Sequence, residues 1–334
     1  MMGRKVFRML FVRMLPAYML LVMVSLFLAP VNSGAQDCVE KKLFFNLDYD
    51  FYDIVFPVSD SGTGFMSSKV GLVFRTEDGG KSWCKIDVET NAAVYKFSFA
   101  DKNNGWGVGQ FGSIIVTKDG GKTWTTQVSP EKNHHMFCVD FTDKLHGVAA
   151  GDWGKIIMTE DGGENWVSVS LEEDIILYDM EFVSRDEGWI AAEMGIIFHT
   201  LDGGKTWERL DLGQGKTFFG ISFDKNGNGV AVGMEGVECY TSDWGKTWTL
   251  QRGAETHLFA VNIVDGKGLA VGDTASIYET KDAGKTWTKI EPPLSIRHIW
   301  FQGLARLSED RFLIAGADGA VLFIEHSKIV SSCP

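Results

Sequence analysis

Residues 117–124 read TKDGGKTW, and closely related octets recur along the chain. They are TEDGGKSW (76–83), TEDGGENW (159–166), TLDGGKTW (200–207), TSDWGKTW (241–248) and TKDAGKTW (280–287). Successive octets begin 39 to 42 residues apart. A period of this length is typical of a propeller blade, a unit of about four short strands. An octet used six times is either six binding sites or one structural part repeated six times.

The segments between the octets have the alternation of β-strands. Each unit opens with six residues in which positions two, four and six are mostly large and apolar, the period of a strand. These segments are FYDIVF (51–56), VYKFSF (94–99), MFCVDF (136–141), LYDMEF (177–182), FFGISF (218–223), LFAVNI (258–263) and IWFQGL (299–304). Their second position is always aromatic: Tyr52, Tyr95, Phe137, Tyr178, Phe219, Phe259 and Trp300. No stretch of 10–12 residues has helical spacing, so we predict an all-β, seven-bladed β-propeller of four-stranded antiparallel blades.

Every element of the octet suits a turn between the third and fourth strands of a blade. The glycines permit positive φ, and the aspartate carboxylate accepts backbone N–H groups within the turn. The tryptophan packs a large apolar side chain on neighbouring structure. We therefore predict structural roles, and not catalysis or ligand binding, for the aspartates and tryptophans of all six octets. They are Asp78, Trp83, Asp119, Trp124, Asp161, Trp166, Asp202, Trp207, Asp243, Trp248, Asp282 and Trp287.

The seventh unit has no octet, and it lacks a fourth strand with the usual tryptophan. The segment CVEKKLFFNL (38–47) precedes the first inner strand and has no partner in its own blade. We predict that it forms the outer strand of the seventh blade, so that the N-terminal strand closes the ring. This would bring Cys38 near the C-terminal SSCP, and a Cys38–Cys333 disulfide is a hypothesis. The cysteines predicted to be small core residues are Cys84, Cys138 and Cys239.

Residues 1–35 resemble a signal peptide, and residues 36–334 form the predicted propeller domain. A basic start with Arg4, Lys5, Arg8 and Arg13 precedes an apolar run over residues 14–29, and residues 33–35 are a small-residue cleavage site. The apolar run is shorter than the roughly 20 residues that span a bilayer, although a retained membrane anchor stays an alternative. We expect an exported protein in the periplasm, in a lumen or secreted.

The chain is strongly acidic, and this excludes one class of partner. It contains 32 Lys and Arg but 44 Asp and Glu, and loss of the four basic residues of the signal leaves a net charge of −16. Such a charge repels phosphate backbones and anionic membrane surfaces. We therefore expect no nucleic-acid partner.

The octet matches the Asp-box of sialidase-type (BNR) repeats. Seven units of about 41 residues, with second strands such as GWGVG (105–109), resemble the photosystem II stability/assembly factor family of chloroplasts and cyanobacteria. The resemblance covers essentially the whole predicted domain. It implies a non-catalytic lumenal or periplasmic scaffold that holds a membrane-protein assembly intermediate. Asp-box propellers also include sialidases, other glycosidases and receptors, so the octet alone does not decide the function.

Three shorter motifs suggest known binding patterns, but their spacing or the predicted strands around them argue against each function. GVGQFG (107–112) matches a dinucleotide-binding pattern, but a strand follows where that pattern needs a helix. DKNGNGVAVGME (224–235) matches a calcium loop, yet five extended residues would hold Glu235 about 16 Å from the other ligands. The pair His134-His135 has no metal-ligand spacing. We predict no metal site and no cofactor.

The turns between strands two and three lie on the face opposite the octets, together with the loops that enter each inner strand. We predict that this face binds the partner. Its candidate residues are Gln110, Phe111, Asp152, Trp153, Glu193, Met194, Met234, Glu235, Asp273, Arg297 and His298. Exposed aromatic and methionine side chains among acids suit a polypeptide. The alternative is that Phe111 and Trp153 pack on neighbouring blades while the acids only keep the protein soluble.

A glycoside hydrolase or a carbohydrate-binding propeller is the alternative function. Hydrolysis of a glycosidic bond needs two carboxylates about 5–9.5 Å apart, and Asp152 with Glu193 is the candidate pair. A sialidase would need three clustered arginines, which the seven arginines outside residues 1–35 cannot supply on the candidate face. We expect a monomeric, non-enzymatic protein that binds another protein, with an oligosaccharide as the alternative ligand.

Overall fold

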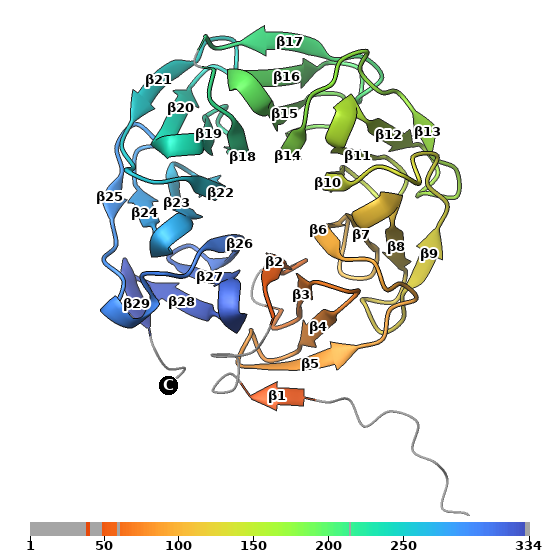
Figure 1. The fold of residues 1–334 in the computed structure, drawn as a ribbon, viewed down its shortest axis with the longest axis horizontal. Helices are drawn as coiled ribbons and strands as arrows, with labels where there is room; N and C mark the ends of the chain where they lie inside the picture. Colours follow the sequence, from red (N-terminus) through yellow and green to blue (C-terminus); the bar gives the residue numbers. More distant parts are fainter. Residues whose placement is uncertain (1–37, 41–48, 59–60, 214, 331–334) are drawn as a thin grey trace, which may run out of the picture. The chain divides into compact units, whose positions relative to one another are not determined.

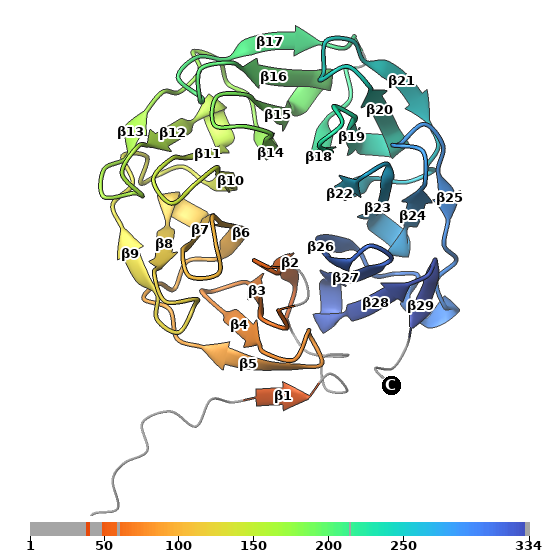
Figure 2. The same cartoon turned by 180° about the vertical axis from the view of Figure 1, so that it is seen from behind.

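The computed structural model describes residues 38–40, 49–58, 61–213 and 215–330. These residues form seven antiparallel β-sheets arranged as blades around a central axis (Figures 1 and 2). The predicted all-β, seven-bladed propeller is therefore confirmed. The predicted signal peptide, residues 1–35, lies outside the described residues. Within the described ranges, no helix has the length and apolarity needed to cross a membrane.

The strands of each blade follow one another outward from the axis. Blade 1 contains β2 (Phe51–Val55), β3 (Gly64–Ser68), β4 (Val73–Thr76) and β5 (Ser82–Ile86); blade 2 contains β6 (Val94–Phe99), β7 (Gly105–Gly109), β8 (Ile114–Thr117) and β9 (Thr125–Gln127). Blade 3 contains β10 (Met136–Phe141), β11 (Gly147–Gly151), β12 (Ile156–Thr159) and β13 (Val167–Ser168); blade 4 contains β14 (Leu177–Phe182), β15 (Gly188–Ala192), β16 (Ile196–Thr200) and β17 (Glu208–Asp211). Blade 5 contains β18 (Phe218–Phe223), β19 (Gly229–Gly233), β20 (Val237–Thr241) and β21 (Thr249–Arg252). Blade 6 contains β22 (Leu258–Val264), β23 (Lys267–Gly272), β24 (Ile277–Thr280) and β25 (Thr288–Lys289); blade 7 contains β26 (Phe301–Ser308), β27 (Arg311–Gly316), β28 (Val321–Glu325) and β29 (Lys328–Val330).

The N-terminal strand does not occupy the place predicted for it. Of the segment 38–47, the structure describes β1 (Cys38–Glu40), which pairs with β5 at the outer edge of blade 1. The outer strand of blade 7 is β29, from the same blade. After β28 the chain reverses through His326 and Ser327, both at positive φ, and pairs with its own edge. For Cys38–Glu40, the prediction of a strand that closes blade 7 was therefore wrong.

The ring closes by direct packing of blade 1 on blade 7. Phe51 of β2 and Leu313 of β27 are both fully buried in one apolar cluster. The backbone N–H of Gly319 also donates to the carbonyl of Tyr49 at 2.6 Å. Apolar packing thus joins the first and last blades, while residues 41–47 of the predicted closing strand lie outside the described residues.

The cysteines differ in part from the prediction. Cys138 and Cys239 are free and buried, as expected of small core residues. Cys84 is instead disulfide-bonded, and Cys38 lies directly opposite it in the β1–β5 pair. Cys333 lies outside the described residues, so the Cys38–Cys333 disulfide stays a hypothesis.

Each octet forms a closed hydrogen-bonded turn. In blade 2, Asp119 Oδ1 accepts the backbone N–H groups of Lys122 and Thr123 at 3.0 Å each, while Thr117 Oγ1 accepts the N–H of Gly121 at 2.8 Å. In blade 5, hydrogen bonds from the hydroxyl and N–H of Thr247 lower the pKa of Asp243 to about 2. The carboxylates therefore serve as acceptors inside their own turns.

The glycine at the fifth position of each octet brings the turn against the preceding blade. A Cβ at Gly121 would lie 2.1 Å from the ring of Phe65 in blade 1, and one at Gly284 would lie 2.3 Å from Val230 in blade 5. At Gly80 the same contact, at 2.7 Å, is with Leu313 of blade 7. The octet therefore holds one blade to the one before it, and the first octet contributes to ring closure.

This packing predicts that substitution costs less folding free energy at the fourth octet position, as at Gly79, than at the fifth, as at Gly121. Both Gly79→Ala and Gly121→Ala place a side chain at positive φ, which costs about 1 kcal/mol. The Cβ at position 79 meets open space, whereas the Cβ at position 121 meets the buried ring of Phe65. Gly121→Ala should lower the unfolding free energy by about 1–3 kcal/mol more than Gly79→Ala. Urea denaturation of both variants measures the difference, and equal losses would contradict this interpretation of the contact.

Polar side chains on the inner strands join each of blades 1 to 5 to the blade that follows it. Asp53 Oδ2 accepts the N–H of Phe97 at 2.8 Å, and Ser98 Oγ accepts the N–H of Phe141 at 2.9 Å. The same arrangement recurs in the pairs Asp140–Phe182, Asp179–Ile221, Glu181–Phe223 and Ser222–Ile263. An inner strand is the edge of its sheet and leaves N–H groups without a strand partner. These side chains satisfy them.

One core position carries a glutamate where other blades have an aliphatic residue. The third residue before each octet is Val73, Ile114, Ile156, Ile197 or Ile277 in five blades, but Glu238 in blade 5. Glu238 is 0% exposed, and neither carboxylate oxygen has a hydrogen-bond partner among the described residues. Burial raises its pKa to about 7. This residue therefore works against folding, and increasingly so as it ionises.

We expect Glu238→Ile to stabilise the protein. The pKa of Glu238 is about 7 in the folded state and near 4.5 in the unfolded state. The stability of the wild-type protein therefore falls as the pH rises from about 4.5 to about 7. Isoleucine does not titrate, and the gain should therefore be about 1–3 kcal/mol larger at pH 8 than at pH 5. Urea denaturation at both pH values measures it, with Glu238→Gln as a control of similar shape. An equal gain at both pH values would show that ionisation is not involved.

Candidate functional site

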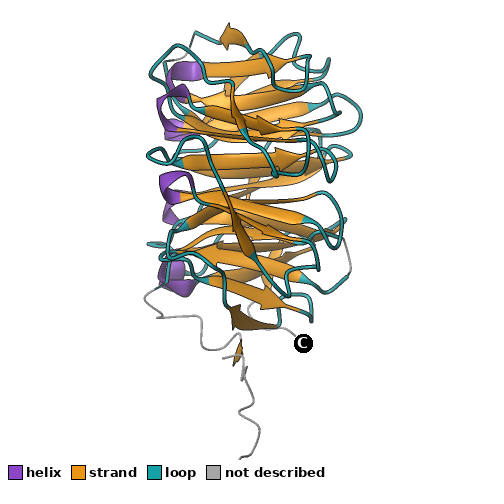
Figure 3. Ribbon diagram, turned by 90° about the vertical axis from the view of Figure 1, so that its right-hand side faces the viewer, coloured by secondary structure: helices purple, strands orange, loops and turns teal. Residues whose placement is uncertain are grey.

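Short 3-10 turns connect strands two and three, and they all lie on one face of the ring (Figure 3). They are η2 (Gln110–Gly112), η3 (Asp152–Gly154), η4 (Glu193–Gly195), η5 (Met234–Gly236), η6 (Asp273–Ala275) and η8 (Ala317–Gly319). A further turn, η7 (Leu294–Ile296), lies in the loop that enters blade 7. The octets lie at the other ends of these strands. The structure thus has the two distinct faces that the repeat predicts.

The middle residue of each turn has a left-handed backbone conformation. Six residues before the first residue of every octet, φ is between 50° and 58°. These residues are Val70, Phe111, Trp153, Met194, Glu235 and Thr274, and Asp318 at φ 53° is their counterpart in blade 7. A side chain in this region is uncommon, and a β-branched or bulky one is an outlier. Only Gly, Asn and Asp adopt it readily.

Four of the seven middle residues are exposed apolar side chains on consecutive blades. Val70 is 64% exposed, Phe111 59%, Trp153 58% and Met194 53%. We call these four residues the apolar crescent. Blades 5 to 7 have Glu235, Thr274 and Asp318 at the same position. The face is therefore apolar over blades 1 to 4 and polar over the remainder.

Val70 was missed from the sequence, although a signal for it exists. Blade 1 has no two-residue turn of the type used to choose the other candidates, but counting back six residues from Thr76 reaches Val70. The predicted candidate Met234 is the first residue of its turn and is only partly exposed. In blade 5 the exposed middle residue is Glu235.

The alternative that Phe111 and Trp153 pack on neighbouring blades holds only in part. The ring of Phe111 lies 5.1 Å from that of His135, centroid to centroid. His135 Nδ1 also accepts the N–H of Phe111 at 3.3 Å. Trp153 makes no ring contact with any described residue. Both side chains keep more than half of their surface exposed.

The predicted acids are mostly engaged by their own surroundings. Asp152 Oδ1 lies 3.0 Å from Nδ1 of His134, and Glu193 Oε2 accepts the N–H of Ile176 at 3.1 Å. Asp273 accepts the N–H of Thr274 at 2.8 Å. Glu235 pairs with Lys216. These contacts favour turn-fixing roles over a glycosidase pair made of Asp152 and Glu193.

Two of the remaining candidates lie near blade 7, and the third, Gln110, lies in blade 2. Arg297 lies 3.5 Å from Glu291, and His298 lies 3.7 Å from Asp318, both as exposed pairs. Gln110 is the first residue of η2, and its backbone N–H donates to the carbonyl of Ala93. The crescent does not include these residues.

An arc of aromatic rings follows the inner strands. Neighbouring ring centroids are 5.0–6.1 Å apart along Tyr52, Tyr95, Phe137, Tyr178, Phe219 and Phe259. Each of these residues lies at a register shift of its strand. In blade 7 the first register shift lies at Gln302. The prediction of Trp300 for this position was wrong, because β26 begins at Phe301, two residues after the predicted start, and places Gln302 there.

A cavity of about 350 Å³ is lined by the inner strands. Its wall includes Asp53, Asp140, Asp179 and Glu181, and Lys96 Nζ lies 3.1 Å from Asp179. Burial raises the pKa of Asp53 and Asp140, and it raises that of Glu181 to about 8. Since most of these carboxyls accept hydrogen bonds between blades, they have a structural role. Among the described residues, no group of three or more His, Cys, Asp or Glu side chains is arranged to hold a metal ion.

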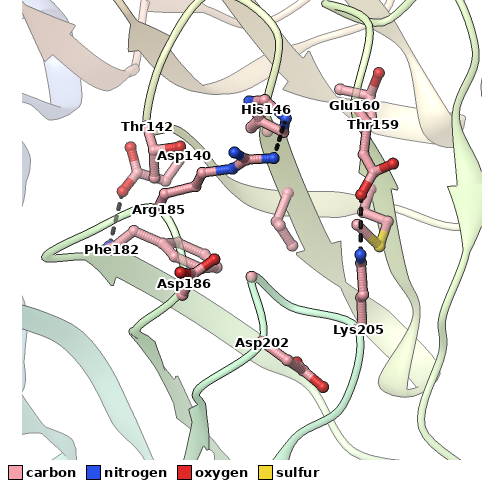
Figure 4. A pocket seen from close by; sticks show the side chains of 14 residues that line it. Asp140, Thr142, His146, Thr159, Glu160, Phe182, Arg185, Asp186, Asp202 and Lys205 are labelled. Carbon is pink, nitrogen blue, oxygen red and sulfur yellow. Dashed lines mark hydrogen bonds and ion pairs between the residues drawn. The ribbon is translucent and has the colours of Figure 1, made fainter.

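A small pocket of about 40 Å³ lies between blades 3 and 4, beside their octets (Figure 4). Arg185 Nη2 lies 2.8 Å from His146 Nε2, and Lys205 Nζ lies 3.0 Å from Glu160. His146 Nδ1 in turn lies 2.8 Å from Asp143. Lys205 and Glu160 form an ion pair, whereas Arg185 and His146 share a hydrogen bond, so these contacts join blades 3 and 4.

Comparison with known proteins agrees with this architecture. The sequence profile described as photosynthesis system II assembly factor YCF48 matches residues 35–127 and 126–217. The chain belongs to the YCF48 family. A solved YCF48 bound to D1 peptide is 17% identical, with a TM-score of 0.69 over 88% of this chain and 98% of that one. YCF48 from Cyanidioschyzon merolae is 19% identical, with a TM-score of 0.69 over 86% of this chain and 98% of that one.

The fold also occurs outside the YCF48 family. An ancestral GH74 enzyme is 14% identical, with a TM-score of 0.66 over 84% of this chain and 46% of that one. At such identities the likeness shows the propeller fold alone. A search of curated proteins found no match.

The backbone conformation of the crescent leads to a stability prediction. Asparagine adopts positive φ more readily than Val or Trp, and both native side chains are mostly exposed. Val70→Asn and Trp153→Asn should therefore leave the unfolding free energy unchanged or raise it by up to about 1 kcal/mol. Thermal and urea denaturation measure this. A loss above about 1 kcal/mol would show that the apolar side chains stabilise the fold.

Proposed function

We propose that this YCF48-family protein is a non-enzymatic scaffold that binds a protein partner through the face with the 3-10 turns. The apolar crescent carries this proposal. Four exposed apolar side chains occupy backbone positions that folding alone would favour giving to Gly, Asn or Asp. Exposed apolar side chains gathered on one face among polar residues are typical of a protein-binding site.

The comparisons support a polypeptide as the ligand. A YCF48 of the same fold has been solved with a D1 peptide bound, and the family is described as an assembly factor. By analogy, the partner is a segment of a membrane-protein assembly intermediate. The engaged state of Asp152 and Glu193 also supports a non-enzymatic role.

The proposed place of action is an exported compartment. This rests on the basic start, the short apolar run and the small residues at 33–35. A periplasmic or lumenal protein would meet its membrane-protein partner as the partner emerges from the bilayer. Its acidic surface would limit adsorption to anionic lipids.

Site-specific photo-crosslinking in native envelopes tests the proposed face. A photoreactive phenylalanine analogue at position 111 or 153 should capture the same partner protein. Capture from position 153 should fall at least fivefold when Phe111 and Met194 are replaced by asparagine, because both contribute to one surface. Mass spectrometry of the crosslinked bands identifies the partner.

Leu201 provides the matched control. It is an apolar residue, 67% exposed, and lies in an octet on the opposite face. A photoreactive residue at position 201 should not capture that partner, and Leu201→Asn should not reduce capture from position 153. Equal capture from both faces, or none from the crescent, would count against the proposed function.

A further inference from the structure

We propose that the apolar crescent binds an extended, positively charged peptide segment with several spaced apolar side chains. This rests on the proposed protein-binding function and specifies the chemistry of the ligand. The acidic composition of the chain alone does not carry it. The positions of apolar side chains and carboxylates on the face support it.

The four crescent residues are equivalent positions on neighbouring blades. Packed β-sheets lie about 10 Å apart, so neighbouring crescent residues are at least about that far apart. An extended chain rises roughly 3.3 Å per residue, and three to four residues bridge one step. A peptide of roughly 12 residues with an apolar side chain at about every fourth position can contact Val70, Phe111, Trp153 and Met194.

Carboxylates lie beside the centre of the crescent. The loop with Glu172, Glu173 and Asp174 packs on the turn of Trp153, where the N–H of Gly154 donates to the carbonyl of Ile175 at 2.7 Å. Glu173 lies 3.7 Å from Arg209. Glu172 and Asp174 are exposed and have no ion pair with any described residue. They are free to pair with lysine or arginine of a ligand.

Several cations on this face are already neutralised. Lys155 lies 3.6 Å from Glu131, Lys216 pairs with Glu235, and Arg297 pairs with Glu291. Lys69 and Lys132, next to the turns of Val70 and Phe111, have no ion pair with any described residue, so the face is not uniformly acidic. The uncompensated negative charge beside Trp153 is that of Glu172 and Asp174. An indole next to carboxylates suits a lysine or arginine, since the cation can contact the ring face and an acid together.

Aromatic contacts extend the crescent towards the inner strands. His135 lies 5.1 Å from Phe111, 6.3 Å from Tyr95 and 6.1 Å from Phe137, between ring centroids. This continuous patch lies at the second crescent residue. An apolar or aromatic residue of the ligand opposite Phe111 would lie beside several rings at once.

The charge also argues against other occupants. A second copy of the chain would present the same acids and be repelled, and so would an anionic membrane surface or a nucleic acid. An acidic peptide would meet Glu172 and Asp174. A cationic, apolar peptide remains as the complementary ligand.

Fluorescence anisotropy with three labelled 16-residue peptides tests this proposal. The first has Leu or Phe at every fourth position and lysines between them, the second has glutamates in place of the lysines, and the third has serines in place of the apolar residues. The first peptide should bind the purified protein at least tenfold more tightly than either of the others. Raising the salt from 50 to 300 mM should weaken its binding several-fold.

Two sets of variants separate the apolar and ionic contributions. Phe111→Asn/Trp153→Asn should weaken the first peptide at least tenfold, and Glu172→Gln/Asp174→Asn should weaken it several-fold and reduce its salt dependence. Leu201→Asn and Val128→Asn replace exposed apolar residues outside the crescent and should have no effect. Folding of each variant is checked by its thermal transition.

Equal binding of the basic and acidic peptides, or no binding of the apolar-basic peptide, would overturn the proposal. Binding that is unaffected by the crescent variants would overturn it as well. A partner captured by crosslinking from position 153 would still support the proposed function in each of these cases. Failure of the ligand chemistry is therefore distinguishable from failure of the binding face.

Discussion

The close approach of the octet to the preceding blade is the contact on which the ring depends. The glycine at the fifth octet position leaves no space for a Cβ, because Phe65, Val148, Val230 and Leu313 lie within 2.9 Å of that position in four of the turns. The turn keeps its shape because the aspartate and threonine satisfy its N–H groups. Hydrogen bonding within one turn thus maintains apolar packing between two blades. Blade 7 has no octet of its own, but the octet of blade 1 packs on it and links the two ends of the ring.

This arrangement leaves the two faces with different freedom. The residue types on the octet face are restricted, because they pack on the preceding blade and form the hydrogen bonds of the turn in almost every blade. On the other face, the middle residue of each turn points to solvent and only has to tolerate positive φ. Folding would favour Gly, Asn or Asp there, and Asp318 fits that preference. The other six residues do not fit it. Among these six, Val70, Phe111, Trp153 and Met194 also expose apolar surface, which folding does not require.

Much of the fold could be predicted, because the information lies in local patterns. The octet period gives the length of one blade. The seven segments with strand alternation give the inner strands and the number of blades. Trp300 was misassigned because alternation has a period of two, so a shift by two residues preserves the pattern. The place of Cys38–Glu40 could not be predicted, since blades 1 and 7 both offered an outer edge. Backbone pairing at an edge carries little sequence information.

For the candidate site, the turns and most exposed residues could be predicted, but the crescent as a set could not. Its members share a backbone conformation and a position six residues before the octet, and they differ in residue type. The charge count is also an incomplete guide to binding. Glu181 lies between blades, and burial raises its pKa to about 8, so it contributes less negative charge near neutral pH than the sequence suggests. The charges available to a ligand are those on exposed loops. At physiological ionic strength their field extends only about 8 Å, which makes Glu172 and Asp174 relevant to a ligand already at Trp153. Attraction would therefore select the charge of the bound segment, while the apolar crescent would determine where it lies.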